Sequence, residues 1–120
     1  MPFRTELELK PYGYKWRTVS HLVYETIAGD YVVVPPNFKT DLASIPRLLR
    51  LICPMHGPYT RAAVVHDYLY STKEIDDTPI ERKRADRIFY EAMRESGVRR
   101  TKAYLMYLAV RAGGWFPWKT

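Results

Sequence analysis

The stretch RAAVVHDYLY at residues 61–70 decides the helical half of the fold, because it joins an apolar run to a polar cluster. Thr60 precedes it and can cap the first turn, so the sequence predicts a helix from Ala62 to about Tyr70. Tyr70 would lie one turn beyond His66 on the same face, whereas Asp67 would point about 100° around the helix. The helix therefore presents an imidazole and a carboxylate in two directions.

Two further helices are predicted downstream. Thr78-Pro79-Ile80-Glu81 has the pattern of a capping box with proline at the first helical position, and Gly97 marks the end of that helix. A last helix from about Thr101 to Ala112 carries an unbroken apolar run over residues 103–110, so we expect it to be the most buried one, closed by Gly113-Gly114. Apolar residues recur at spacings of three and four along the second helix: Ala85, Ile88, Phe89, Ala92 and Met93.

The N-terminal third predicts strands instead. Residues 16–25 are rich in aromatic and β-branched side chains, Gly29-Asp30 offers a turn, and Tyr31-Val32-Val33-Val34 follows, which together indicate a β-hairpin. Residues 5–10 alternate and would add a third antiparallel strand that ends at Pro11. Pro35-Pro36 would stop the sheet.

These elements define the expected architecture. The strands occupy about residues 1–36, and the helical part occupies about residues 44–116. The helical part begins with a short helix from Ser44 through Ile52. The fold class is α+β, with an N-terminal antiparallel β-hairpin or three-strand meander followed by three to four helices, two of them an antiparallel pair. At 120 residues the chain is predicted to form one domain, 1–120.

Composition narrows the function classes without choosing among them. Cys53 is the only cysteine, which excludes an internal disulfide and a cysteine-based zinc site. The net charge of +6 suits nucleic acid, an anionic membrane surface or an acidic protein. Nucleic acid is the less favoured partner, because the basic residues are scattered and no nucleic-acid-binding motif accompanies them. The aromatic end, Trp115, Phe116 and Trp118, could insert at a membrane interface, form an oligomer contact, or fold back on the core.

The polar residues of the helix pair could carry chemistry. If the first two helices pack antiparallel, the Asp86 carboxylate approaches the His66 ring. A carboxylate on one imidazole nitrogen fixes the tautomer and leaves the other nitrogen to take a proton from water, as in a hydrolase. The alternative is a buried histidine that bonds Tyr70 or Asp86 for stability only.

A metal site near this helix is a second possibility. Asp67 alone is too little for calcium, which takes six to eight oxygen ligands. Thr40, Asp41 and Ser44 offer further oxygens close to the helix start. Asp41 would be a second carboxylate ligand beside Asp67, or would cap the turn that follows it.

Three sequence blocks carry a first resemblance. VPPNFKTDLASIPR at 34–47, RAAVVHDYLY at 61–70 and ADRIFYEAM at 85–93 resemble, in that order, a family of short phage and prophage proteins that is a domain of unknown function. The match covers about residues 30–116. It implies a phage setting, with the protein made in the host cytoplasm during phage production or carried in the virion, and no reaction. No stretch of the sequence is long and apolar enough to span a bilayer, so we expect a soluble protein.

A second resemblance concerns the helix pair alone. His66, Asp67 and Tyr70 match the His-Asp-x-x-Tyr signature of phospholipase A2, and Asp86 matches the later aspartate on the partner helix. The resemblance implies that His66 is the general base, that Asp67 is a Ca²⁺ ligand, and that Tyr70 and Asp86 hydrogen-bond the histidine. The segment 53–59 holds one glycine and two prolines, unlike the glycine-rich calcium loop of that family.

Two functions are therefore expected. The first is a phage-encoded lipid-ester hydrolase, metal-assisted and acting in entry or lysis at an anionic membrane surface. The alternative is a non-enzymatic virion or assembly protein that binds other phage proteins, in which the same residues are structural and the C-terminal aromatic residues form a subunit interface.

Overall fold

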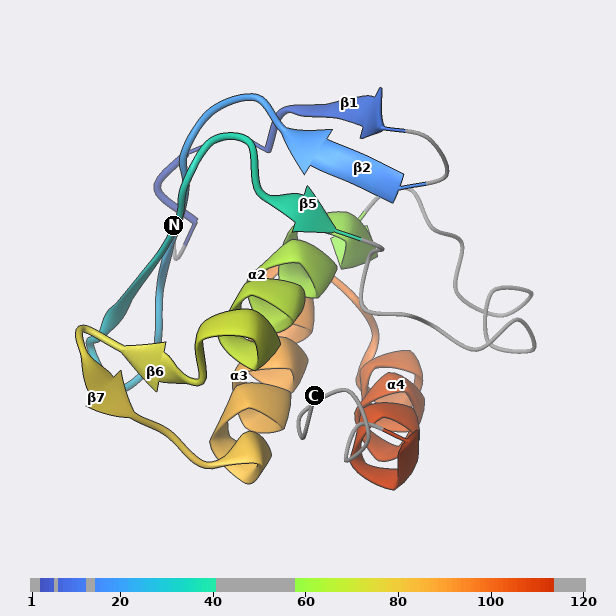
Figure 1. The fold of residues 1–120 in the computed structure, drawn as a ribbon. Coiled ribbons are helices and arrows are strands. Elements are labelled where there is room, and N and C mark those ends of the chain that lie inside the picture. Colours follow the sequence, from blue (N-terminus) through green and yellow to red (C-terminus); the bar gives the residue numbers. More distant parts are fainter. Residues whose placement is uncertain (1–2, 6, 13–14, 41–57, 114–120) are drawn as a thin grey trace.

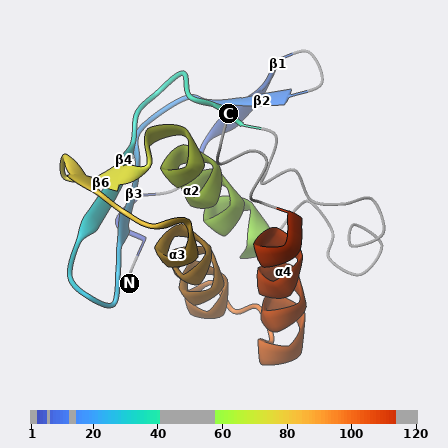
Figure 2. The same ribbon diagram turned by 60° about the horizontal axis from the view of Figure 1, so that its bottom comes forward.

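The computed structural model describes residues 3–5, 7–12, 15–40 and 58–113 of the chain (Figure 1). Three helices follow the N-terminal strands, namely α2 (Pro58–Thr72), α3 (Arg82–Glu95) and α4 (Arg100–Gly113). Helix α2 packs against strands on one side and against α3 on the other, and α4 packs on α3 (Figures 1 and 2). The α+β class is confirmed.

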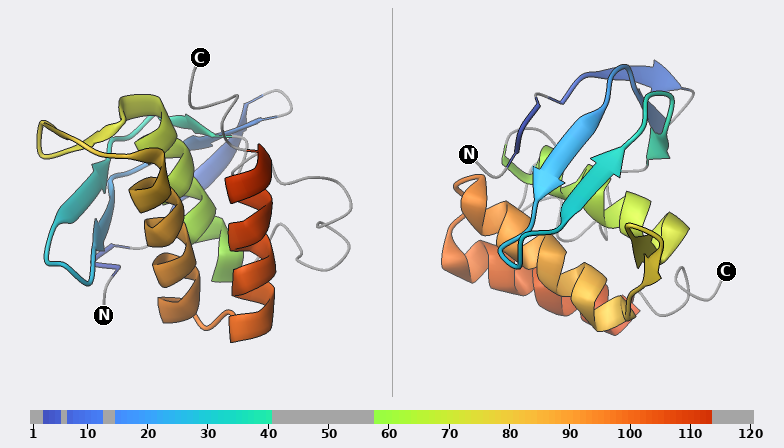
Figure 3. Two further views of the ribbon diagram at one scale, coloured as in Figure 1. Left: turned by 90° about the horizontal axis from the view of Figure 1, so that it is seen from below. Right: turned by 90° about the vertical axis from the view of Figure 1, so that its left-hand side faces the viewer.

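The strands that precede α2 form two antiparallel groups. Strands β1 (Leu9–Tyr12), β2 (Lys15–Thr18) and β5 (Lys39–Thr40) make one sheet in the order β1-β2-β5. Strands β3 (Leu22–Glu25) and β4 (Tyr31–Val34) make the expected hairpin. Figure 3 shows both groups beside the helices.

Three details of the strand prediction were wrong. Residues 16–25 are two strands rather than one, because the chain changes partner between Val19 and Leu22. Strand β2 pairs with β1, and the Val19 N–H extends that pairing to the Glu8 carbonyl, whereas β3 pairs with β4. The first strand covers Leu9–Tyr12 rather than residues 5–10 and runs through Pro11, which an edge strand tolerates. After Pro35-Pro36 the chain returns to β2 as β5.

Helix α2 lies at the centre of the core. Its buried side chains include Val64, Val65 and Leu69, and they meet the inward residues of the β3–β4 hairpin, among them Leu22 and Tyr24. Tyr24 also donates a hydrogen bond of 2.8 Å to Glu91 of α3. Burial of apolar surface around α2 is therefore what joins strands to helices.

Helix α4 is not the most buried helix, contrary to the prediction. Ala103, Met106 and Val110 are buried, but Tyr104, Leu105 and Leu108 are 52%, 45% and 44% exposed. The apolar run continues around the whole helix, whereas α4 packs by one face only, at the side of α3 (Figure 2).

The expected capping box is also wrong. Thr78–Pro79 is strand β7, paired with β6 (Glu74–Ile75) across a turn at Asp76 and Asp77, whose φ angles are 49° and 63°. Two left-handed residues make the tight turn that fits a short hairpin. The Ile80 N–H then donates to the Lys73 carbonyl, so the chain stays extended and α3 begins at Arg82.

Helices α2 and α3 run antiparallel, as predicted. Arg61 at the start of α2 bonds Ser96 just after α3, while Tyr70 near the end of α2 bonds Asp86 near the start of α3. None of the helices within the described residues is long and apolar enough to cross a membrane. The predicted helix over residues 44–52 and the aromatic end from Trp115 lie outside the residues that the structure describes.

Gly97 ends α3 as predicted. The N–H of Gly97 donates to the Arg94 carbonyl and that of Val98 to the Met93 carbonyl, which is the Schellman arrangement. Gly97 has a φ of 96°, and Val98 is buried. The glycine thus turns the chain so that Val98 enters the core.

We expect Gly97→Ala to lower the free energy of unfolding by about 1–2 kcal/mol, because an alanine must adopt a positive φ there. Nothing lies within 4 Å of an added Cβ, so the cost comes from the backbone alone. Urea unfolding measures it. Glu95→Ala, at an exposed position in the same turn, is the control and should change stability by less than about 0.5 kcal/mol. Equal effects of the two variants would contradict this account of the helix end.

Candidate active site

The helix pair brings together the three residues that the sequence placed in a catalytic group. The His66 Nε2–H donates to Asp86 Oδ1 at 2.7 Å, and the Tyr70 hydroxyl donates to the same oxygen at 2.6 Å. His66 and Tyr70 are one turn apart on α2, and Asp86 faces them from the second turn of α3. The predicted contact between the carboxylate and the imidazole is therefore present.

The second oxygen of the Asp86 carboxylate faces two arginines. Arg111 of α4 donates to Oδ2 at 3.0 Å, and Arg82, one turn earlier on α3, lies 3.6 Å from the same atom. Arg82 also donates to the backbone carbonyls of Val110 and Arg111 at 3.3 and 3.2 Å. Asp86 thus joins all three helices.

Burial and hydrogen bonding act in opposite directions on this carboxylate. Burial alone raises the pKa of Asp86, but the hydrogen bonds from His66 and Tyr70, the electrostatic interaction with His66 and the bond from Arg111 together lower it below its ordinary value. Burial, together with the hydrogen bond to Asp86, raises the pKa of the Tyr70 hydroxyl. Asp86 is accordingly an anion, and Tyr70 stays a protonated donor.

Aromatic rings enclose the imidazole. The His66 ring centre lies 4.3 Å from that of Tyr70 and 4.6 Å from that of Phe89 on α3. The His66 side chain is 4% exposed and the Asp86 side chain is fully buried. The surroundings are therefore low in polarity, which strengthens each polar contact within the group.

Asp67 points to a different element. Its Oδ2 accepts a hydrogen bond from the Thr40 hydroxyl at the end of β5. Asp41 and Ser44 lie outside the described residues, so the other predicted oxygens have no described position. Within the described part of the chain, no group of three or more acidic, histidine or cysteine residues could hold a metal ion. The donors that are described, one carboxylate and one hydroxyl, do not by themselves fit calcium.

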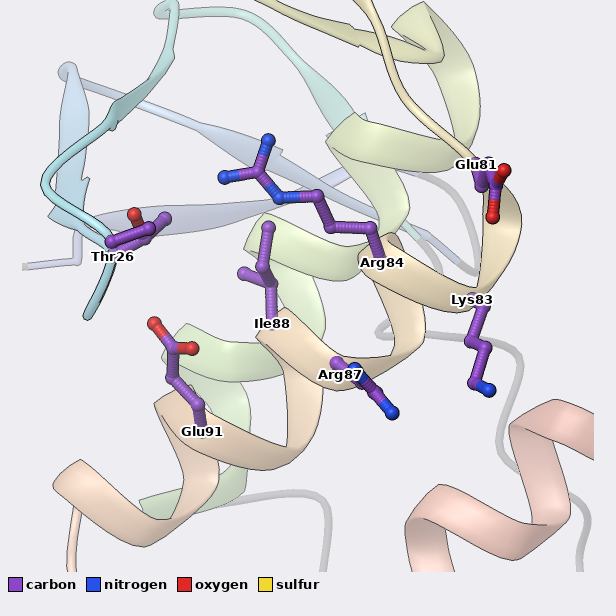
Figure 4. Close-up of a pocket in the computed structure, with 8 residues that line it drawn as sticks. Thr26, Glu81, Lys83, Arg84, Arg87, Ile88 and Glu91 are labelled. Atoms are coloured by element: carbon purple, nitrogen blue, oxygen red, sulfur yellow. The ribbon is translucent and has the colours of Figure 1, made fainter.

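A separate pocket of about 330 Å³ lies between the β3–β4 turn and α3 (Figure 4). Two of its charged side chains have structural partners: Arg84 pairs with Asp30, and Glu91 accepts bonds from Tyr24 and Ile27. Its other basic residues, Lys83 and Arg87, point away from Thr26 (Figure 4). The contacts of Arg84 and Glu91 hold the β3–β4 hairpin on α3.

Sequence reasoning missed both arginines of the site. The spacing of four between Arg82 and Asp86 is that of a helical ion pair, a local signal that could have identified Arg82. Arg111 is 25 residues from Asp86, and no local pattern connects the two. Only the packing of α4 on α3 reveals it.

Fold and site together define an α+β chain whose antiparallel helices enclose a buried histidine–aspartate pair. The chain belongs to the family described as "Protein of unknown function (DUF1353)", whose profile matches residues 16–110.

Two curated relatives come from Sinorhizobium fredii. The chain is 41% identical to "Uncharacterized protein y4iH" over 78 residues, which are 63% of this chain and 30% of that protein. It is 39% identical to "Uncharacterized protein y4jT" over 83 residues, which are 68% of this chain and 23% of that protein. The chain therefore spans less than a third of either relative. No solved structure matches it significantly.

We expect Asp86→Asn to lower the free energy of unfolding at pH 7 by about 3–5 kcal/mol, because it leaves the buried partners of the carboxylate uncompensated. The folded-state pKa of Asp86 is lowered, so its stabilising contribution is present above the unfolded pKa of about 3.9 and is lost as the pH falls through the folded value. Urea unfolding between pH 2.5 and 7 should show this loss of unfolding free energy at falling pH in the wild type and not in the variant.

The matched control is Asp77→Asn. Asp77 is exposed on the β6–β7 turn and has a left-handed φ that asparagine tolerates. The control should keep the stability of the wild type to within about 0.5 kcal/mol. A small loss for Asp86→Asn, equal to that of the control, would refute the central role of this carboxylate.

Proposed function

We propose that this chain is a hydrolase that cleaves lipid esters, with His66 as its general base and Asp86 and Tyr70 as positioning residues. The bond between His66 Nε2 and Asp86 Oδ1 carries the proposal, because it assigns the proton to Nε2 and makes Nδ1 the basic nitrogen. Tyr70 holds the carboxylate from the same side at 2.6 Å.

In the proposed reaction His66 Nδ1 removes a proton from a water molecule while the water oxygen attacks the ester carbonyl carbon. The tetrahedral intermediate then collapses, and the carbon–oxygen bond to the alcohol breaks. The imidazolium returns its proton to the departing alkoxide, which leaves as the alcohol, and the other product is the fatty acid. The ring ends the cycle in its starting form.

The arginines support the pair during this cycle. When His66 takes the proton, the adjacent Asp86 carboxylate stabilises the imidazolium without receiving a proton itself. Arg111 and Arg82 bind the other carboxylate oxygen, and the pKa of Asp86 is lowered, so the carboxylate stays ionised. The two arginines therefore hold Asp86 in place, and Asp86 in turn fixes the orientation of the His66 ring.

The substrate class and the setting rest on sequence. The phospholipase A2 resemblance of His66, Asp67, Tyr70 and Asp86 supports a lipid ester, and the net charge of +6 favours an anionic bilayer. The phage resemblance of the three sequence blocks supports a role in phage entry or lysis. Calcium, which the same resemblance implies, enters as a variable of the experiment below.

A second function is favoured by a different observation. The His66 side chain is 4% exposed and that of Asp86 is fully buried, which suits a polar cluster that locks three helices together. On this account the chain is a non-enzymatic phage virion or assembly protein. Activity, rather than stability, separates the two functions, because both predict that the cluster stabilises the fold.

We expect the purified chain to release free fatty acid from vesicles of mixed phosphatidylglycerol and phosphatidylcholine, and His66→Asn to lower the rate at least 100-fold through loss of the base. Fatty acid is measured with calcium, with other divalent ions and with chelator, below the melting temperature of each variant. His21→Asn, at an exposed histidine, is the matched control and should keep the wild-type rate.

Either result decides between the two functions. Release that His66→Asn abolishes and His21→Asn retains supports the hydrolase, and its response to chelator then measures the metal requirement. If the wild type releases no more than His66→Asn under every ion, the hydrolase proposal fails and the structural function stands.

A further inference from the structure

Helix α4 carries an apolar stripe on its outward face. Tyr104, Leu105 and Leu108 are 52%, 45% and 44% exposed, and Thr101 and Ala112 are exposed on the same side. These positions follow the spacing of three and four residues that defines one face of a helix. Isolated exposed apolar residues are ordinary, but a stripe along one helix indicates a binding surface.

Basic residues border this stripe. On an α-helix of about 100° per residue, Arg100 and Lys102 lie roughly 100° to either side of the stripe, between it and the buried face. Arg99 is exposed just before the helix, and α4 itself has no acidic residue. No acidic side chain within the described residues pairs with Arg99, Arg100 or Lys102.

These charges are unfavourable for the helix itself. The first turn of α4 holds two basic residues and no acidic ones, whereas the positive end of the helix dipole favours acidic ones there. In α3 the equivalent charges of Arg82 and Arg84 have the internal partners Asp86 and Asp30. Within the described residues, Arg100 and Lys102 have no such acidic partner, which favours an anionic binding partner for this end of α4.

We propose that this face of α4 is the surface by which the chain docks on an anionic lipid bilayer, with Leu105 and Leu108 in the acyl region and Arg100 and Lys102 at the headgroups. An apolar stripe with cationic borders is the arrangement of helices that lie in a membrane interface. A second copy of the chain fits less well, because two α4 helices facing each other would bring cations together without any acidic residue on α4 to pair them.

The docking face is linked to the candidate active site. Arg111 of the same helix binds Asp86, and Arg82 beside Asp86 binds the carbonyls of Val110 and Arg111. Docking by α4 would therefore place the His66 pair one helix layer from the lipid. That the docked lipid is also the substrate rests on the proposed function. Docking itself is measured with the His66→Asn variant, which lacks the proposed base, so lipid hydrolysis does not interfere.

The test measures sedimentation of His66→Asn with vesicles of phosphatidylglycerol and phosphatidylcholine, and with pure phosphatidylcholine. Binding should need the anionic lipid and weaken as salt rises. Adding Leu105→Ser and Leu108→Ser should weaken it at least tenfold, because the apolar anchor is lost. Adding Arg100→Gln and Lys102→Gln should weaken it about 25-fold, at about fivefold per cation.

Matched variants show whether the effect belongs to α4. Val19→Ser with Val33→Ser changes two apolar residues that are 49% and 45% exposed elsewhere, and Arg17→Gln with Lys39→Gln removes two cations from β2 and β5. Both pairs should bind within about twofold of the parent.

Three outcomes would overturn the proposal. They are absence of sedimentation with anionic vesicles, equal losses in the α4 and control variants, and a dimer in solution that Leu105→Ser with Leu108→Ser dissolves while vesicle binding is unchanged. Binding without fatty acid release by the wild type would leave the docking surface standing and reject the hydrolase alone.

Discussion

The fold depends on how it neutralises one buried carboxylate. The Asp86 side chain is fully buried, and an ionised group without water is tolerated only when charge and hydrogen bonds replace its hydration. Its two oxygens take those partners from α2, α3 and α4, so none of the three helices can shift without loosening a bond to Asp86. The carboxylate therefore sets the relative position of the helices, while apolar packing around α2 supplies most of the stabilisation.

The parts of the structure that sequence predicted are those set by local spacing. His66 and Tyr70 are one turn apart, and an antiparallel partner helix is enough to bring Asp86 to them. Arg111 could not be found in this way, because its contact depends on how α4 packs on α3. The start of α3 was misplaced for another reason: the left-handed turn at Asp76 and Asp77 extends Thr78–Pro79 into a strand and overrides the capping pattern.

Helix α4 shows why apolar content does not define burial. A run of apolar residues covers every face of a helix, whereas packing on one neighbour hides only one of them. The sequence therefore marked α4 as apolar without telling which residues face outward. Placed on α3, the helix separates into a buried side at Met106 and Val110 and an exposed side at Leu105 and Leu108. Helix α4, which the sequence predicted to be a core helix, is therefore a candidate docking helix.

Stability and catalysis would use the same bond in this protein. A buried histidine needs a partner to be stable, and a carboxylate partner also fixes which ring nitrogen carries the proton. Because the hydrogen bonds from His66, Tyr70 and Arg111 keep the pKa of Asp86 below its ordinary value, the orientation of the ring does not depend on a proton moving to the carboxylate. A cluster kept only to hold helices together would therefore already present an oriented base at Nδ1. The Nδ1 atom is itself buried, so hydrolysis would also require an opening that lets water and an ester carbonyl reach it.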